Sequence, residues 1–320
     1  MTIALSRWLA AALISSLLSG PAWGEALDVV ATVKPVHALV AAIMQDVGTP
    51  ELIVDGAASP HTYSFKPSNA TALSRADLVF RIGPGFETFL EKPLESLSGK
   101  ALIVTLADAP GVTTLPLREG GLFEPHEDGD DQAEKDSHGH DHAGPHGEID
   151  MHLWLDPANA KAMANEIARR LATADPDHAQ LFERNRAELA RQIDEMDARM
   201  KEKLAPFRHK PFIVFHDAYQ YLERAYGLTV AGSITVSPEA MPGARRIQEI
   251  HAKILSAGAV CVFAEPQFEP RLVETVLEGT PAHAGTLDPE GGSLKPGAGL
   301  YLTLMDNLAT SLVDCLSKAS

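Results

Sequence analysis

Three histidines stand at points where an apolar stretch of the chain gives way to a loop or a helix. They are His61, His152 and His216. In open parallel sheets, ligands bind beyond the carboxyl ends of the strands, so side chains at such points can converge on one cleft. Because neutral imidazole is a preferred ligand of zinc, these residues predict a Zn2+ site.

A fourth ligand is needed to complete a tetrahedron with bonds of about 2.0–2.2 Å. Asp288 follows another strand-like stretch and is the candidate, with a water molecule as the alternative. Taken singly, each residue has an ordinary structural explanation, since a histidine at a strand end can be a capping residue and an aspartate before Pro289 can start a turn. The prediction therefore depends on the sequence around all four residues.

Carboxylates next to the histidines have two possible roles. A metal-binding histidine usually donates its second ring N–H to a carboxylate or a carbonyl, and Asp156 and Asp217 are candidates for this role. Each also precedes a predicted helix, where it can accept hydrogen bonds from the first backbone N–H groups. Helix capping is the interpretation that we favour for both.

Residues 118–148 differ in composition from the rest of the chain. They contain ten acidic residues against Arg118 and Lys135, and scarcely any large apolar side chain, which predicts a mobile loop. The loop also carries His126, His138, His140, His142 and His146. We expect these histidines to form an auxiliary, low-affinity collector of metal that is sensitive to pH, with a plain solvated linker as the alternative.

Residues 1–24 have the order of a cleaved secretory signal peptide. Arg7 precedes an apolar run at 8–18, and the small-x-small triplet at 22–24 predicts cleavage near Gly24 or Ala26. The apolar run is shorter than the roughly 20 residues that a membrane-spanning helix needs. We therefore expect an exported, soluble protein, with an uncleaved anchor as the alternative.

The chain carries a formal net charge of -16 at pH 7. Binding to nucleic acid or to an anionic membrane surface would require clustered Lys and Arg, so the charge argues against both as partners. Cations are the ligands that such a surface favours.

Strand-like and helix-like stretches alternate through the first half of the chain. Strands are expected at 27–32, 51–54, 78–82 and 101–105, and helices at 36–47, 68–75, 86–97 and 157–171. The alternation resumes after residue 206. Strands are expected there at 212–215, 228–233, 260–264 and 283–286, and helices at 218–226, 243–256, 270–277 and 301–316. This pattern is typical of parallel sheets with helices on both faces.

The longest helical pattern follows Pro176 and ends at Pro206. One of its faces is apolar and consists of Leu181, Leu189, Ile193, Met196, Met200 and Leu204. About 28 residues make a rod of roughly 40 Å, long enough to connect two lobes. A coiled-coil dimer arm is the alternative, but the apolar pattern covers few heptads.

The expected fold class is α/β, with two Rossmann-like lobes of parallel sheets joined by one long rigid helix and a metal site in the cleft between the lobes. The boundaries predicted for the parts are 25–172 for the N-terminal lobe, 173–206 for the linker helix and 207–320 for the C-terminal lobe. The two cysteines, Cys261 and Cys315, suggest one disulfide in an oxidising compartment, with two unrelated buried thiols as the alternative.

Five blocks of sequence together resemble the zinc branch of the metal-specific solute-binding proteins of ABC importers. They are PHTYSFKPS at 60–68, DMHLWLDP at 150–157, FHDAY at 215–219, AEPQF at 264–268 and GTLDP at 285–289. The resemblance spans nearly the whole mature chain. It implies a periplasmic protein that binds zinc with His61, His152, His216 and, as the fourth ligand, Asp288. It also supports a Cys261–Cys315 disulfide. The partners it implies are a membrane permease and an accessory zinc chaperone, and we expect a monomer.

The residue at position 216 bears on the choice of metal. Manganese-binding relatives tend to carry a carboxylate where this chain has His216, and hard oxygen ligands suit manganese as imidazole suits zinc, so zinc is favoured over a manganese-binding homologue. Some zinc-branch members carry an acidic residue where this chain has Pro60, which leaves Asp288 or water as the fourth ligand.

Two other functions use the same chemistry. A zinc hydrolase also holds its metal with three histidines and an open position, but the chain has no His-Glu-x-x-His helix and no obvious general base beside the histidines. A zinc-buffering metallochaperone of the periplasm is the second alternative. We expect a binding protein, not an enzyme.

Overall fold

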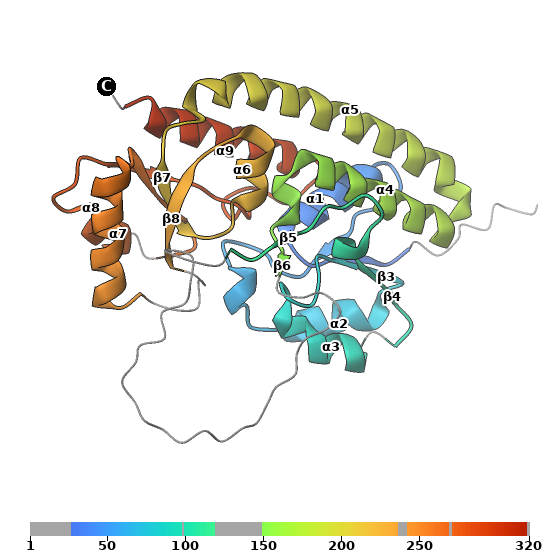
Figure 1. Ribbon diagram of the computed structural model, residues 1–320. Helices are drawn as coiled ribbons and strands as arrows, with labels where there is room; N and C mark the ends of the chain where they lie inside the picture. The colour runs from blue at the N-terminus through green and yellow to red at the C-terminus, as the bar shows by residue number, and fades with distance from the viewer. Residues whose placement is uncertain (1–26, 98, 119–148, 236–241, 269–270, 319–320) are drawn as a thin grey trace, which may run out of the picture.

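The N-terminal half of the computed structural model forms a four-stranded parallel sheet. The structure describes residues 27–97, 99–118, 149–235, 242–268 and 271–318. The sheet order is β2 (Glu51–Leu52), β1 (Val29–Ala31), β3 (Leu78–Arg81), β4 (Leu102–Thr105). Its central strands are continuous apolar runs, because helices cover both faces. Figure 1 shows α1 and α4 on one side of the sheet and α2 and α3 on the other. These helices are α1 (Lys34–Ile43), α2 (Pro67–Arg75), α3 (Glu91–Leu97) and α4 (Pro157–Ala174).

The C-terminal half contains a second parallel sheet of four strands. Its order is β10 (His283–Thr286), β9 (Cys261–Ala264), β7 (Phe212–His216), β8 (Val230–Thr235). Alternate residues of β7 pack on opposite faces, with Ile213 and Phe215 in a core with α7 and α8, and Phe212 and Val214 in the core that includes α9. The helices of this half are α6 (Gln220–Tyr226), α7 (Ala244–Ala257), α8 (Arg271–Leu277) and α9 (Leu300–Leu316).

One long helix, α5 (Ala179–Leu204), runs across both halves (Figure 1). It packs on α1 and α4 of the first half and on α9 of the second. Its buried stripe is Phe182, Leu189, Ile193, Met196, Met200 and Leu204. The stripe begins at Phe182 instead of the predicted Leu181, because the spacing from 182 to 189 continues the three- and four-residue steps of the stripe.

The predicted fold class is confirmed: two parallel sheets flanked by helices are connected through a long helix. The boundaries 25–172, 173–206 and 207–320 remain predictions. The predicted signal peptide and the five histidines of the acidic loop lie outside the described residues. Within the described part of the chain, no helix combines the length and the apolar character needed to cross a membrane.

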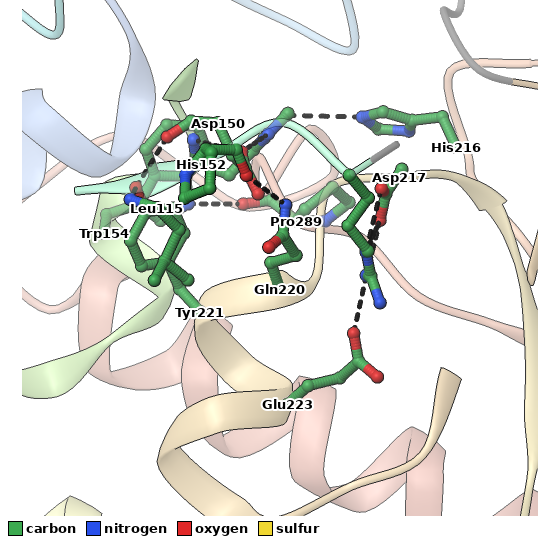
Figure 2. A network of polar contacts seen from close by, with 12 residues as sticks. Leu115, Asp150, His152, Trp154, His216, Asp217, Gln220, Tyr221, Glu223 and Pro289 are labelled. Carbon is green, nitrogen blue, oxygen red and sulfur yellow. Dashed lines mark hydrogen bonds and ion pairs between the residues drawn. The ribbon is translucent and has the colours of Figure 1, made fainter. Parts of the chain in front are cut away.

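A short antiparallel ribbon, β5 (Leu115–Pro116) with β6 (Ile149–Asp150), was not predicted, because two residues per strand leave no periodic pattern. It docks on α6 of the second half. The hydroxyl of Tyr221 accepts from the backbone N–H of Leu115 at 2.9 Å and donates to the carbonyl of Asp150 at 2.7 Å (Figure 2). These two hydrogen bonds fix the ribbon against the second half of the chain, and with it the segment that leads to His152.

The predicted disulfide between Cys261 of β9 and Cys315 of α9 is confirmed. It fastens the last helix to the sheet. Beside it, Gly285 of β10 has no room for a side chain, since a Cβ would lie 2.5 Å from the ring of Phe263. The close approach of β10 and β9 at this point requires glycine.

Candidate metal centre

The structure brings the three predicted histidines together. One ring nitrogen each of His61, His152 and His216 lies within 4.8 Å of the other two, which is the one such grouping of histidine, cysteine or acidic side chains among the described residues. The residues are 91 and 64 positions apart in sequence, so only the fold makes them neighbours. His61 lies after β2 of the first sheet, His152 follows the ribbon, and His216 ends β7.

His61 lies in a 3-10 turn, Pro60–Thr62, that follows β2. The hydroxyl of Ser59 accepts a hydrogen bond from the backbone N–H of His61 at 3.3 Å and caps the turn. Tyr63 ties the turn back to the strand, because its hydroxyl donates to the carbonyl of Ile53 at 2.9 Å. The Phe86 ring and the His61 imidazole make a T-shaped contact, with ring centroids 5.0 Å apart.

His152 is oriented by Asp150, two residues before it. The Asp150 carboxylate accepts from the backbone N–H of His152 at 3.0 Å and contacts its Nδ1 at 2.8 Å (Figure 2). Trp154 packs beside the imidazole, with centroids 5.4 Å apart, and donates its indole N–H to the carbonyl of Pro289 at 2.8 Å. The short β6 strand ends at Asp150, so the carboxylate that orients the imidazole lies two residues before His152 at the end of this strand.

His216 is oriented in the same way by Glu265, which follows β9. Nδ1 of His216 lies 2.7 Å from Oε1 of Glu265, and the hydroxyl of Tyr219 donates to the same oxygen at 3.3 Å. Glu265 is buried at the carboxyl end of the strand adjacent to β7. A metal-binding histidine typically has such a carboxylate on its other ring nitrogen.

The two carboxylates fix the tautomers of the imidazoles. With Nδ1–H of His152 directed at Asp150 and Nδ1–H of His216 at Glu265, both Nε2 atoms carry lone pairs and face each other at 3.3 Å. Two ligands on a tetrahedral zinc ion with bonds of about 2.05 Å are separated by about 3.3 Å. The pair therefore has the separation that a shared cation would require.

Burial keeps two of the imidazoles neutral. Burial, and then His152 and His216, hold the pKa of His61 well below its ordinary value. Burial, and then His216, hold the pKa of His152 well below its ordinary value as well. Burial lowers the pKa of His216 as well, but the Glu265 carboxylate more than offsets it and raises that pKa. Burial raises the pKa of Asp150 to about 7. A cation placed among the rings would favour the neutral imidazoles and the ionised Asp150.

The structure does not place Asp288 in the group of ligand atoms within 4.8 Å. Its side chain lies near the carboxyl end of β10, two strands from β7 in the same sheet. Oδ1 accepts from Nε2 of Gln267 at 2.9 Å and from the backbone N–H of Glu290 at 3.3 Å, while Oδ2 accepts from the backbone N–H of Ser293 at 3.4 Å.

Asp156 caps α4, as favoured, because its carboxylate accepts from the backbone N–H of Ala158 at 2.8 Å. Asp217 does neither of the two things considered for it. Arg118 holds both of its oxygens, at 2.5 to 3.1 Å, and also reaches Glu223 at 2.6 Å. Figure 2 shows Asp217 and Glu223, the latter on α6, on opposite sides of the group to which dashed lines join them.

The carboxylates that orient the rings, Asp150 and Glu265, were missed by the sequence interpretation, although both lie in the quoted blocks. The available signal was an acidic residue two positions before a candidate histidine and another at a strand end. Another histidine that follows a strand in the sequence, His37 of α1, lies outside the cluster, and its Nε2 contacts the carbonyl oxygen of Pro50.

A family model described as "Zinc-uptake complex component A periplasmic" matches residues 29–315. A high-affinity zinc uptake system protein ZnuA from Brucella suis is 50% identical over 329 aligned positions, which cover 98% of each chain. The protein of the same description from Yersinia pestis is 36% identical and covers 97% of this chain and 98% of its own. A crystal structure of ZnuA superimposes with a TM-score of 0.74 at 25% identity, covering 91% of this chain and 99% of that one.

Proposed function

The chain belongs to the family of periplasmic zinc-uptake complex component A, and on that premise we propose that it captures Zn2+ for an ABC importer with His61, His152 and His216. The family supplies the biological role, a solute-binding protein of zinc uptake. The histidine cluster supports the assignment of that role to particular atoms of this chain.

One observation supports the site above all others. The Nε2 atoms of His152 and His216 face each other at 3.3 Å while their Nδ1 atoms are directed at buried carboxylates. When both rings are neutral, two lone pairs repel at this distance unless a cation or a proton lies between them. Nitrogen donors of this kind favour zinc over the harder manganese ion.

The test is elemental analysis and zinc titration of purified protein beside three single variants. His61→Ala, His152→Ala and His216→Ala are each expected to lose the tight zinc ion of the cleft. His283→Ala, at an exposed position outside the cluster, is the control. Retention of a tight ion in all three cleft variants would exclude this site.

Asp288 is the protein group proposed for the fourth position, where water is the alternative. Its hydrogen bonds to Gln267 and to the backbone hold it away from the ring nitrogens in the present conformation. We propose that water completes the tetrahedron in this conformation and that Asp288 replaces water when those bonds are broken.

The acidic loop is proposed to collect zinc near the cleft through His126, His138, His140, His142 and His146. Deleting residues 119–147 is expected to lower the number of weakly bound zinc ions and to leave the tight ion in place. Unchanged stoichiometry in a zinc titration would reject this role.

The remaining parts of the proposal concern export, oligomeric state and partner proteins. We propose that residues 1–24 are removed on export, that the mature chain is a monomer, and that it passes zinc to a membrane permease without catalysing a reaction. An accessory periplasmic chaperone is a further proposed partner. Pull-down with the cognate permease and mass measurement of the exported protein test these points.

A further inference from the structure

The segment 288–294, which we name the Asp288 loop, follows β10 in sequence but is held by side chains of the first half of the chain. Trp154 donates its indole N–H to the carbonyl of Pro289 (Figure 2). Lys34, at the start of α1, is 4% exposed and donates through Nζ to three further carbonyls. They are those of Gly291 at 3.2 Å, Gly292 at 2.7 Å and Leu294 at 2.9 Å.

Lys34 and Trp154 are both buried, so water cannot replace the loop carbonyls as their hydrogen-bond partners while the surrounding packing stays intact. Trp154 is also two residues from His152, so the loop is fixed relative to that ligand candidate. Movement of Asp288 toward the metal must therefore come from its side chain and not from a shift of the loop.

Gln267 is packed against this fixed loop. A Cβ on Gly292 would lie 3.0 Å from Nε2 of Gln267 and 3.3 Å from Cα of Ala57, so glycine allows the amide to approach. The amide must present its NH2 group to Asp288, since the flipped rotamer would place an oxygen against the carboxylate. Its Oε1 is buried and has no hydrogen-bond partner among the described residues.

We propose that Gln267 is a positioning residue that withholds Asp288 from the metal and so keeps the fourth coordination position open to water. This inference rests on the proposed function of the three histidines. The ends of β7 and β10 are separated by one strand, about 10 Å between backbones, a gap that two side chains and a zinc ion can span. What prevents this bond is the set of hydrogen bonds on the Asp288 oxygens, of which Gln267 supplies the side-chain donor.

The consequence concerns both release and selectivity. A carboxylate in place of water would add a negatively charged oxygen ligand, bind zinc more tightly and favour the harder manganese ion. With Asp288 withheld, three neutral nitrogens and a replaceable water bind zinc selectively and release it faster. A protein that must hand its metal to a partner benefits from this arrangement.

The experiment compares wild type with Gln267→Met, which keeps the side-chain length and removes the donor. We expect zinc dissociation into a chelator to slow by about tenfold or more, and Mn2+ to compete better for the site. The double variant with Asp288→Asn should return to the faster dissociation. The matched control is Gln192→Met, because Gln192 also donates to a carboxylate, that of Glu188 at 2.8 Å, but lies on the outer face of α5.

A second measurement needs only the wild-type protein loaded with Co2+. Azide should bind at the open fourth position and change the visible absorption spectrum, and it should fail to do so in Gln267→Met. Insensitivity of wild type to azide, or unchanged zinc dissociation in Gln267→Met, would overturn the inference. Failure of the proposed function is a different result, namely that wild type takes up no stoichiometric metal.

Discussion

At the scale of single residues, the centre consists of nitrogen ligands whose direction is set by carboxylates that do not touch the metal. Asp150 and Glu265 each hold one imidazole by Nδ1 and leave Nε2 for the ion. Arg118 and Gln267 engage two other acidic side chains, Asp217 and Asp288. Two of the four acidic side chains therefore orient imidazoles, and the other two are bound to other side chains. This arrangement leaves the neutral imidazole nitrogens as the ligands of the cation.

Asp150→Asn tests the orienting role. An amide can present its NH2 group to Nδ1 of His152 and favour the wrong tautomer, so zinc affinity should fall by about 10- to 100-fold, measured by competition with a chelator. Asp175→Asn is the control, because Asp175 contacts the remote His178 at 2.6 Å in the same manner. Equal losses in the two variants would show a general effect of the substitution.

Zinc affinity should also fall as the pH drops through 7. In the metal-free protein, burial raises the pKa of Asp150 to about 7, so this carboxyl group holds a proton below that pH. Burial lowers the pKa of His216, but Glu265 and other nearby carboxylates more than offset this and raise it, so this ring also holds its proton more strongly than a free imidazole. Zinc expels these protons, and affinity should decrease by up to about tenfold per pH unit for each proton released. His61 and His152, whose pKa values are lowered, add nothing near pH 7. A flat affinity between pH 6 and 8 would contradict this account.

At the scale of elements, the sequence predicted most of what carries the histidines. Apolar β-branched runs and amphipathic stripes are local signals, and they located β3, β7, β10 and α5 to within a few residues. The ribbon β5–β6 and the roles of Lys34 and Trp154 have no local signal, because each depends on a partner more than 30 residues away. Asp288 was located by its motif, but its restraint by Gln267 depends on tertiary contacts.

The contact between β10 and β9 gives a prediction at this scale. Gly285→Ala would place a methyl group 2.5 Å from the Phe263 ring, which is fully buried and cannot move aside. Overpacking of this kind costs about 1–3 kcal/mol of unfolding free energy, measurable by denaturant titration. Gly299→Ala, where no atom lies within 4 Å of the new Cβ, should change stability little. Equal stability of the two variants would show that β10 shifts freely.

At the scale of the whole molecule, several separate contacts join the two halves of the chain. Helix α5 packs on both halves, the ribbon docks on α6, and the Asp288 loop is held by Lys34 and Trp154. The core cluster that includes Val30 and Met196 also includes Leu308 of α9, so no apolar boundary separates the halves. Such a frame favours small movement on metal binding.

Small-angle scattering of the wild-type protein should therefore give superimposable profiles with and without zinc.

The Lys34→Met variant tests whether the contact between Lys34 and the Asp288 loop contributes to this rigidity. It leaves three loop carbonyls without their buried donor and should lower the unfolding free energy by about 1–3 kcal/mol. Its metal-free form should also be more expanded in solution than wild type. Lys203→Met is the control, since its exposed ammonium donates to Thr310 of α9 and makes no contact with the Asp288 loop, so it should affect neither quantity. A large compaction of wild type on adding zinc would contradict this account. It would mean that the two halves move apart in the metal-free protein, and that Lys34 and Trp154 bind the Asp288 loop only when metal is present.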